Sequence, residues 1–369
     1  MDQPQKFKRC MVFAGGGFRF GIYLGMVAAA RDAGRAPDLL LATCGGALAA
    51  AVIQALPDDA QRKAWLASPQ MYDFWRGLQP APQATIARTL WLAAQRKLAQ
   101  QAAPTVPDLF NDYLFEVPHH LPLPPPAETS EVTVATVGGQ LLFGPADAGQ
   151  PRGTRKLFVQ TVFGDARVAA LLQGMRSPFN DPRWGPHAVA DAVLTVQGLP
   201  LDAAARLSII DFFYFPPYAH AGQRYIGGVV DLFPVELAQR LAGEVMMEFK
   251  ESFDQNFSIP AWRSVLGLDG NQRLRQVNSQ ALDVWIDTSD ISTALARNQV
   301  GKKLDWRGNR IGLRLPPSYA DYQRAIDAQW QYGYQRVQEA LQRPQPADKS
   351  AMRHVDRYNS AKELTPCVS

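Results

Sequence analysis

Residues 11–19 read MVFAGGGFR, and residues 38–48 read DLLLATCGGAL. In both segments a short apolar run is followed by small residues and then by apolar residues at helical spacing, so each predicts a strand, a tight turn and a helix. Two such units within about fifty residues are typical of a parallel sheet covered by helices. We therefore predict an α/β fold.

Apolar patterning extends this prediction along the chain. It indicates further strands at 131–137, 156–163 and 282–286. It indicates helices at 166–173, 201–210 and 319–341. The segment 282–286 is the last clear strand in the pattern. The domain is predicted to span residues 1–342, and residues 343–369 to form a polar tail.

Residues 57–130 differ from their surroundings, because amphipathic helical stretches there are interrupted by prolines. We predict that this segment is an inserted helical cap or lid. Within it, Ile86, Leu90 and Leu98 share one helical face. We expect this face to pack onto the domain, and the alternative is a helix that contacts a membrane surface.

Composition and charge narrow the class of protein. Hydrophobic residues make up 47% and charged residues 20% of the 369 residues, which fits a globular chain. The net charge of +4 comes without a dense basic run, so we expect no nucleic-acid partner. Cys10, Cys44 and Cys367 lack metal-ligand spacing, and we expect no metal, cofactor or disulfide. Without a signal-peptide pattern or an apolar run of roughly 20 residues, we expect a cytoplasmic protein with at most peripheral membrane contact.

The first turn contains Gly15, Gly16 and Gly17 between a strand and a helix. Glycine permits backbone conformations closed to other residues and leaves amide N–H groups that face an anion. Such a turn can stabilise an oxyanion or bind a phosphate, and Arg19 beside it can brace the loop or contact a phosphate. A nucleotide is disfavoured, because the Gly-Lys-Ser/Thr sequence of phosphate-binding loops is missing.

The second turn places Cys44 between Ala42 and Gly46. A nucleophile elbow needs small residues two positions before and two positions after the nucleophile, so that its side chain stands exposed above the sheet. We expect the dipole of the following helix to lower the pKa of the Cys44 thiol below its usual value of about 8.5. The alternative is a buried structural cysteine.

From about residue 8 to residue 340, the order and spacing of the motifs resemble those of patatin-like phospholipases. GGGFRFGIYLGM at 15–26 is similar to the family's oxyanion loop, and ATCGGAL at 42–48 to its Gly-x-Ser-x-Gly elbow. FPP at 215–217 and YIGGVVDLFPVE at 225–236 are similar to the segment that carries its catalytic aspartate.

The resemblance implies a three-layer α/β/α domain with a mostly parallel central sheet. It also implies lipid acyl chemistry in an oxyanion hole formed by Gly15, Gly16, Gly17 and Gly45. Four departures occur at the residues that would do this chemistry. Cys44 replaces the serine, and the other three are Ala42 and Phe20, which replace glycines, and Ile226, which replaces the aspartate.

The loss of the aspartate leaves the general base open. A cysteine needs less help than a serine, because a thiolate can attack without a base. We predict Asp231 as the acid–base partner, since it lies on the Gly227–Gly228 turn, and His220 and Asp211 are the alternatives. Each also has a structural explanation: a helix cap for Asp231, a solvated loop for His220 and a buried hydrogen bond for Asp211.

Two functions fit these residues. The first is an acyl hydrolase or acyl transferase that acts on a lipid ester or thioester through a Cys44 acyl-enzyme, with Arg19 as a substrate contact. The second is an inactive relative whose cleft binds an acyl ligand or a protein partner. Losing the aspartate while gaining a cysteine is consistent with both, and we favour the enzyme.

Overall fold

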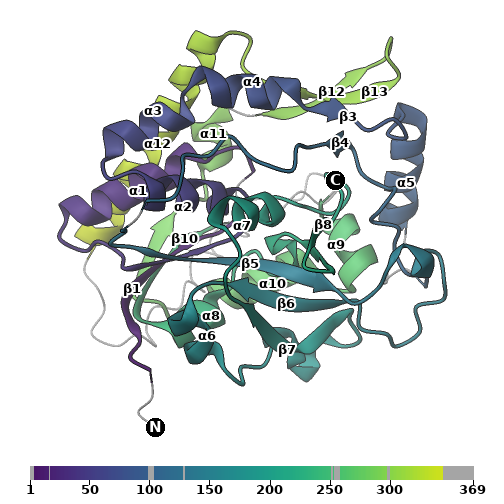
Figure 1. Cartoon of the computed structure of the whole chain (residues 1–369), viewed down its shortest axis with the longest axis horizontal. Coiled ribbons are helices and arrows are strands. Elements are labelled where there is room, and N and C mark those ends of the chain that lie inside the picture. The colour runs from purple at the N-terminus through teal and green to yellow at the C-terminus, as the bar shows by residue number, and fades with distance from the viewer. Residues whose placement is uncertain are drawn as a thin grey trace, which may run out of the picture.

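The structure is a computed structural model that describes residues 4–15, 17–98, 104–127, 129–250, 252, 258–296 and 300–343. In this part of the chain, a central sheet of nine strands is covered by helices on both faces (Figure 1). The sheet is mostly parallel. The predicted three-layer α/β/α architecture is confirmed.

Seven strands form the main path of the sheet. They are β1 (Phe7–Phe13), β2 (Leu39–Ala42), β5 (Thr133–Leu141), β6 (Phe158–Phe163), β7 (Val189–Val196), β10 (Ala242–Phe249) and β11 (Val284–Asp287). Their order is β11-β10-β1-β2-β5-β6-β7, and only the β5–β6 pair on this path is antiparallel. The hairpin of β8 (Tyr218–His220) and β9 (Gln223–Ile226) attaches to β5 through β9.

Both faces of β1 and β2 are buried. Met11, Phe13 and Leu40 pack into the core on one face, and Cys10 and Val12 pack into the core on the other. The first face is covered by α1 (Gly21–Asp32), α2 (Gly45–Ala55), α7 (Leu201–Ser208) and α12 (Tyr319–Gln342). The second face is covered by α6 (Ala166–Leu172), α8 (Val235–Leu241) and α10 (Gly270–Asn278). This double burial explains why both strands read as continuous apolar runs.

The described residues of the segment predicted as a cap form three helices and two short strands. These are α3 (Asp59–Leu66), α4 (Pro69–Gly77), β3 (Gln79–Pro80), α5 (Ile86–Leu98) and β4 (Phe115–Glu116). Strand β3 pairs with β4. The role of this segment as a lid stays a prediction.

The remaining elements are short. They are the helices α9 (Ser258–Leu266) and α11 (Ile291–Ala294), the hairpin strands β12 (Gly301–Asp305) and β13 (Arg310–Arg314), and the 3-10 turns η1 (Pro145–Asp147), η2 (Pro178–Asn180), η3 (Pro182–Trp184) and η4 (Gly228–Val230). Strands β12 and β13 thus follow the segment 282–286, which the pattern indicated as the last clear strand. Strand β12 is largely exposed and rich in Lys, so it lacks an apolar signature, whereas β13 is short and buries only Ile311 fully. The predicted tail lies outside the described residues, except for Arg343.

Helix α5 does not pack as expected. Ile86 is buried, but Leu90 and Leu98 are exposed. The helix turns its other side inward, where the Arg96 guanidinium lies 3.3 Å from the centre of the Phe213 ring. No helix in the described ranges is both long enough and apolar enough to cross a bilayer.

Helices α1 and α12 approach each other closely at Gly25. A Cβ atom at Gly25 would lie 2.0 Å from the carbonyl oxygen of Trp330, so only glycine fits there. At the start of α1, the Gly21 N–H donates to Oε1 of Gln329 over 3.0 Å. Because α1 follows the glycine loop directly, α12 helps to fix the position of that loop.

We expect Gly25→Ala to lower the free energy of unfolding by about 1–3 kcal/mol, because the added methyl group would push α1 away from α12. The loss should appear even though alanine is favoured over glycine in a helix by about 1 kcal/mol. Urea unfolding measures it, with Gly77→Ala as the control, since a Cβ at Gly77 meets no atom within 4 Å. A Gly25→Ala protein as stable as the parent would contradict the close approach.

Candidate active site

Cys44 connects β2 to α2 in a strained backbone conformation, with φ 48° and ψ −130°. This conformation is unfavourable for a residue that has a side chain, and such strain concentrates at functional sites. The glycines that follow Cys44 are required by their surroundings. A Cβ atom at Gly45 would lie 2.3 Å from the carbonyl oxygen of Gly17, and one at Gly46 would lie 2.6 Å from that of Phe13. The Cys-Gly-Gly sequence therefore follows from the packing of the turn.

The turn is also held from the side of the third motif. The Thr43 N–H donates to the carbonyl oxygen of Phe13 over 2.9 Å, and the Thr43 hydroxyl donates to the carbonyl oxygen of Leu232 over 3.2 Å. A Cβ atom at Gly228 would lie 2.6 Å from Cβ of Thr43, so the Gly227–Gly228 turn packs directly on the elbow. The three motifs of the sequence therefore meet at one point.

Cys44 is half-buried and lines a cavity of about 640 Å³. Gly15, Gly17 and Gly45 line the same cavity. It lies at the carboxyl ends of β1, β2 and β10, where ligands bind in open α/β sheets. Gly16, the remaining predicted oxyanion residue, lies outside the described residues. The thiol is therefore presented to a cavity and is not sealed in the core.

Much of the cavity wall is apolar. Phe20, which stands where the family has a glycine, stacks on Trp75 with 5.4 Å between ring centres, and both residues line the cavity. Phe18 packs edge-on against Trp75 at 4.9 Å. These aromatic rings give the cavity a wall suited to an apolar group.

The expected lowering of the Cys44 pKa is wrong for this structure. Burial, followed by the negative charge of Asp211, raises the pKa of the thiol to about 12. The backbone amides of Gly45 and Gly17 and the charge of Lys250 oppose this rise but do not overcome it. The helix dipole is therefore outweighed by the loss of water around the sulfur. The amides of Gly45 and Gly17, which lower the pKa of the thiol, also lie close to any oxyanion that forms beside the sulfur.

Asp211 is the carboxylate that shares the cavity with Cys44. Burial raises its pKa to about 6, while a hydrogen bond from the Phe212 N–H, the charge of Lys302 and a hydrogen bond from Trp262 act in the opposite direction. The Phe212 N–H donates to Oδ1 of Asp211 over 2.7 Å. Asp211 is therefore mostly ionised at neutral pH while retaining a pKa suited to proton transfer.

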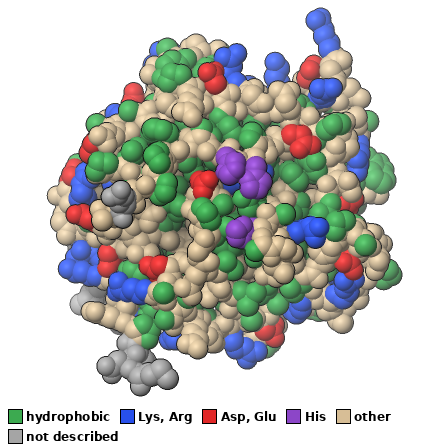
Figure 2. All heavy atoms as spheres, in the orientation of Figure 1, with side chains coloured by type: hydrophobic (Ala, Val, Ile, Leu, Met, Phe, Trp, Pro, Cys, Tyr) green, Lys and Arg blue, Asp and Glu red, His purple; other side chains and the backbone are tan. Residues whose placement is uncertain are grey.

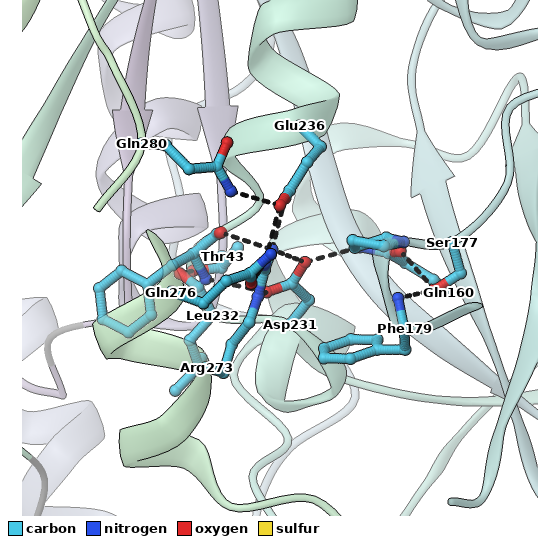
Figure 3. A network of polar contacts seen from close by, with 12 residues as sticks. Thr43, Gln160, Ser177, Phe179, Asp231, Leu232, Glu236, Arg273, Gln276 and Gln280 are labelled. Atoms are coloured by element: carbon cyan, nitrogen blue, oxygen red, sulfur yellow. Dashed lines mark hydrogen bonds and ion pairs between the residues drawn. The ribbon is translucent and has the colours of Figure 1, made fainter. Parts of the chain in front are cut away.

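Asp231, the predicted partner, does not line this cavity. It is buried in an ion pair with Arg273, whose Nη2 lies 3.0 Å from its Oδ2 (Figure 3). Gln160 donates to the same oxygen over 3.2 Å, and Glu236 shares the guanidinium. Burial raises the pKa of Asp231, and the charge of Arg273 opposes that shift. The structure thus gives Asp231 a structural role instead of bringing it to Cys44, and α8 begins with Pro234 as its cap residue.

The other positions considered for the base also lie elsewhere. His220 ends β8 and does not line the cavity. Ile226, which the motif resemblance places at the family's aspartate, is buried on β9 opposite Gly139. Among the candidates named from the sequence, only Asp211 reaches the cavity.

Lys250, which was not predicted from the sequence, lines the cavity just after β10. Its Nζ donates to the carbonyl oxygen of Gly15 over 2.8 Å and lies 3.4 Å from a carboxylate oxygen of the buried Glu248. Lys250 therefore ties the glycine loop to the sheet. The sequence offered one signal for this site: the carboxylate of Glu248 stands two residues before Lys250 in the apolar run EVMMEFK at 244–250.

Arg19 lines the cavity and is half-buried, and its role as a substrate contact stays a prediction. Burial lowers its pKa, and the charge of Glu248 opposes that change. Within the described ranges, no group of three or more His, Cys, Asp or Glu side chains is placed to hold a metal ion. The cavity therefore combines a thiol, a carboxylate, amide groups and cations.

Comparisons with known proteins identify one matching family. A family model described as patatin-like phospholipase matches residues 11–238, more than half of the chain, including all three motifs. Among solved structures, the crystal structure of VipD from Legionella pneumophila is similar, with 12% sequence identity and a TM-score of 0.33. That match covers 91% of this chain and 67% of the other. No curated protein matches the chain.

We expect Asp231→Asn to destabilise the protein by about 3 kcal/mol, because it leaves the buried Arg273 without one of its two carboxylates. Thermal and urea unfolding measure the loss. Asp191→Asn is the matched control, since the Asp191 carboxylate is about half exposed and its ion pairs are longer than 3.5 Å. The structural role would be contradicted if Asp231→Asn left the stability unchanged but altered the rate at which Cys44 is alkylated.

We expect Asp211→Asn to increase the rate at which iodoacetamide alkylates Cys44 at pH 8. Removing the negative charge lowers the pKa of the thiol and raises the thiolate fraction. The rate is measured by peptide mass over time, with the buried Cys10 as an internal reference that stays unlabelled. An unchanged or slower rate would show that the two side chains are not electrostatically coupled.

Proposed function

Because the chain belongs to the patatin-like phospholipase family, we propose that it is a lipid acyl hydrolase or acyl transferase in which Cys44 replaces the serine nucleophile. Family membership supports lipid acyl hydrolysis in general, and the cysteine nucleophile is proposed for this chain. The observation that carries the proposal is the strained elbow, which presents a half-buried thiol to the cavity.

In the proposed reaction, the Cys44 sulfur attacks the carbonyl carbon of a lipid ester or thioester. The thiol proton passes to the Asp211 carboxylate as the S–C bond forms, because a thiol with a pKa of about 12 is not ionised at neutral pH. Asp211 then returns the proton to the leaving alcohol or thiol as its bond to the carbonyl carbon breaks. Water or another acyl acceptor releases the acyl group and restores the thiol.

The glycine loop and the start of α2 would stabilise the tetrahedral intermediate. Its oxyanion would accept hydrogen bonds from backbone amides among Gly15, Gly16, Gly17 and Gly45. The influence of the Gly17 and Gly45 amides on the Cys44 sulfur supports this assignment. Each well-placed donor of this kind contributes roughly a hundredfold to a thousandfold in rate.

The walls of the cavity support a lipid substrate. The aromatic rings of Phe18, Phe20 and Trp75 would pack on the acyl chain. Arg19 and Lys250 place positive charge in the same cavity, where they would favour an anionic part of the substrate.

A second candidate is an inactive relative that binds an acyl ligand or a protein partner. Two observations favour it: Ile226 stands where the family has its aspartate, and burial raises the pKa of the Cys44 thiol. The cavity would then hold a ligand without cleaving it. Turnover measurements distinguish the two candidates.

We expect the protein to release acyl product from a water-soluble thioester or ester, and Cys44→Ala to reduce turnover by roughly three orders of magnitude or more. The ratio kcat/KM should rise with pH through about 6, because only ionised Asp211 can accept the thiol proton. Asp211→Asn should abolish this dependence and lower turnover.

Asp211→Asn thus has opposite effects on two measurements, with faster alkylation of Cys44 and slower turnover. Asp191→Asn serves as the control, because its carboxylate lies on the surface away from the cavity. Turnover retained by Cys44→Ala would overturn the nucleophile assignment. A wild-type protein without turnover that binds a fatty acid in a Cys44-facing cavity would establish the second candidate.

A further inference from the structure

The outer face of α5 is apolar although it faces solvent. Ala87, Leu90, Trp91, Ala94 and Leu98 are all exposed, and their spacing places them on one face of the helix. Leu90 is 45% exposed, Trp91 60% and Leu98 82%. A helix that packs on a domain normally turns its apolar side chains inward, whereas α5 also carries an apolar set that faces solvent.

The β12–β13 hairpin extends this apolar surface. An isolated bridge joins Thr85 to Arg310, and the Ile86 N–H donates to Oδ1 of Asn309 over 3.3 Å, so the hairpin lies against the start of α5. In the turn after β12, Trp306 is 70% exposed, and Leu304 beside it is 41% exposed. Figure 1 shows the hairpin and α5 side by side at one edge of the molecule.

The exposed large apolar side chains are concentrated here. In the part of the chain that the structure describes there are seven of them, and five lie on α5 and the hairpin. The other two, Leu142 and Leu194, lie elsewhere on the surface. We call the five residues and their exposed neighbours on these two elements the docking face. A concentration of this kind marks an interaction surface.

Positive charge is concentrated on the same two elements. Residues 86–98 carry three Lys or Arg side chains, and residues 301–314 carry five, against one carboxylate, Asp305. Asp112 pairs with Arg88 and with Arg96, which is turned inward. With this carboxylate counted, the local charge of +6 still exceeds the +4 of the whole chain, so the rest of the chain is net negative. Figure 2 shows basic and hydrophobic side chains next to each other along the edge where Figure 1 places α5.

The docking face also adjoins the cavity. Gly301, Lys302 and Leu313 of the hairpin line the Cys44 cavity. The inner side of α5 lines a smaller pocket that shares Asp211 and Lys302 with that cavity. A surface that contacts the docking face therefore lies next to the Cys44 cavity.

We propose that α5 and the tip of the β12–β13 hairpin dock the protein on an anionic lipid bilayer, with Trp91 and Trp306 inserted at the interface. Tryptophan favours the boundary between headgroups and acyl chains, and lysine and arginine are attracted to anionic headgroups. The helix lies in the plane of the bilayer surface and does not cross it. Docking needs no turnover at Cys44, so it goes beyond the proposed function and can fail independently of it.

The full chain is tested by co-sedimentation with phosphatidylcholine vesicles, with and without phosphatidylglycerol. We expect binding to the vesicles that contain phosphatidylglycerol, weakened by added salt. Trp91→Ser with Trp306→Ser should reduce binding roughly tenfold or more. Lys303→Gln and Arg307→Gln should each reduce it about fivefold.

The control is Leu142→Ser with Leu194→Ser, which removes exposed apolar side chains outside the docking face and should leave binding unchanged. Thermal unfolding checks that all variants are folded. The tryptophan variants should keep wild-type turnover of a water-soluble ester, which separates a failure of docking from a failure of the active site.

Three results would overturn the proposal. The first is the absence of binding to both kinds of vesicle, and the second is equal binding to neutral and anionic vesicles. The third is dimerisation without lipid that the tryptophan substitutions abolish, because the docking face would then be an interface between copies of this chain.

Discussion

The backbone of Cys44 has a positive φ angle, and the rest of the site is built around that strain. A residue with a side chain adopts this conformation only where its neighbours impose it. Here the hydrogen bond from Thr43 to the end of β1 fixes one side of the turn, and the glycines at 45, 46 and 228 let three segments approach closely. The result is a thiol directed into a cavity at the end of the sheet.

The two buried aspartates show how position decides the role of the same carboxylate. Asp231 lies beside the guanidinium of Arg273, so its charge is compensated and it ties the third motif to α10. Asp211 faces the cavity near Cys44, where burial raises its pKa to about 6. A carboxylate held in an ion pair contributes to the fold, whereas one that remains available in a cavity can exchange a proton.

The site and the surface beside it share structural elements. The hairpin of β12 and β13 contributes to the wall of the Cys44 cavity and also carries Trp306. Helix α5 turns Arg96 inward onto Phe213 and leaves Leu90 and Trp91 in solvent. The same orientation that satisfies the buried guanidinium therefore creates the exposed apolar face.

Local patterning was sufficient to predict the α/β class, the two strand–turn–helix units and Cys44 at the elbow, because these features depend on neighbours in sequence. Glycines that permit a tight turn and apolar residues that bury a strand can be recognised without knowing what packs against them. The resemblance of the three motifs likewise pointed to the family. Tertiary structure alone decided which carboxylate faces the thiol, that burial outweighs the helix dipole at Cys44, and which side of α5 meets solvent. Each of these depends on groups far away in the sequence, such as Arg273 for Asp231 and Phe213 for Arg96. A local sequence pattern does not show which distant residues come into contact.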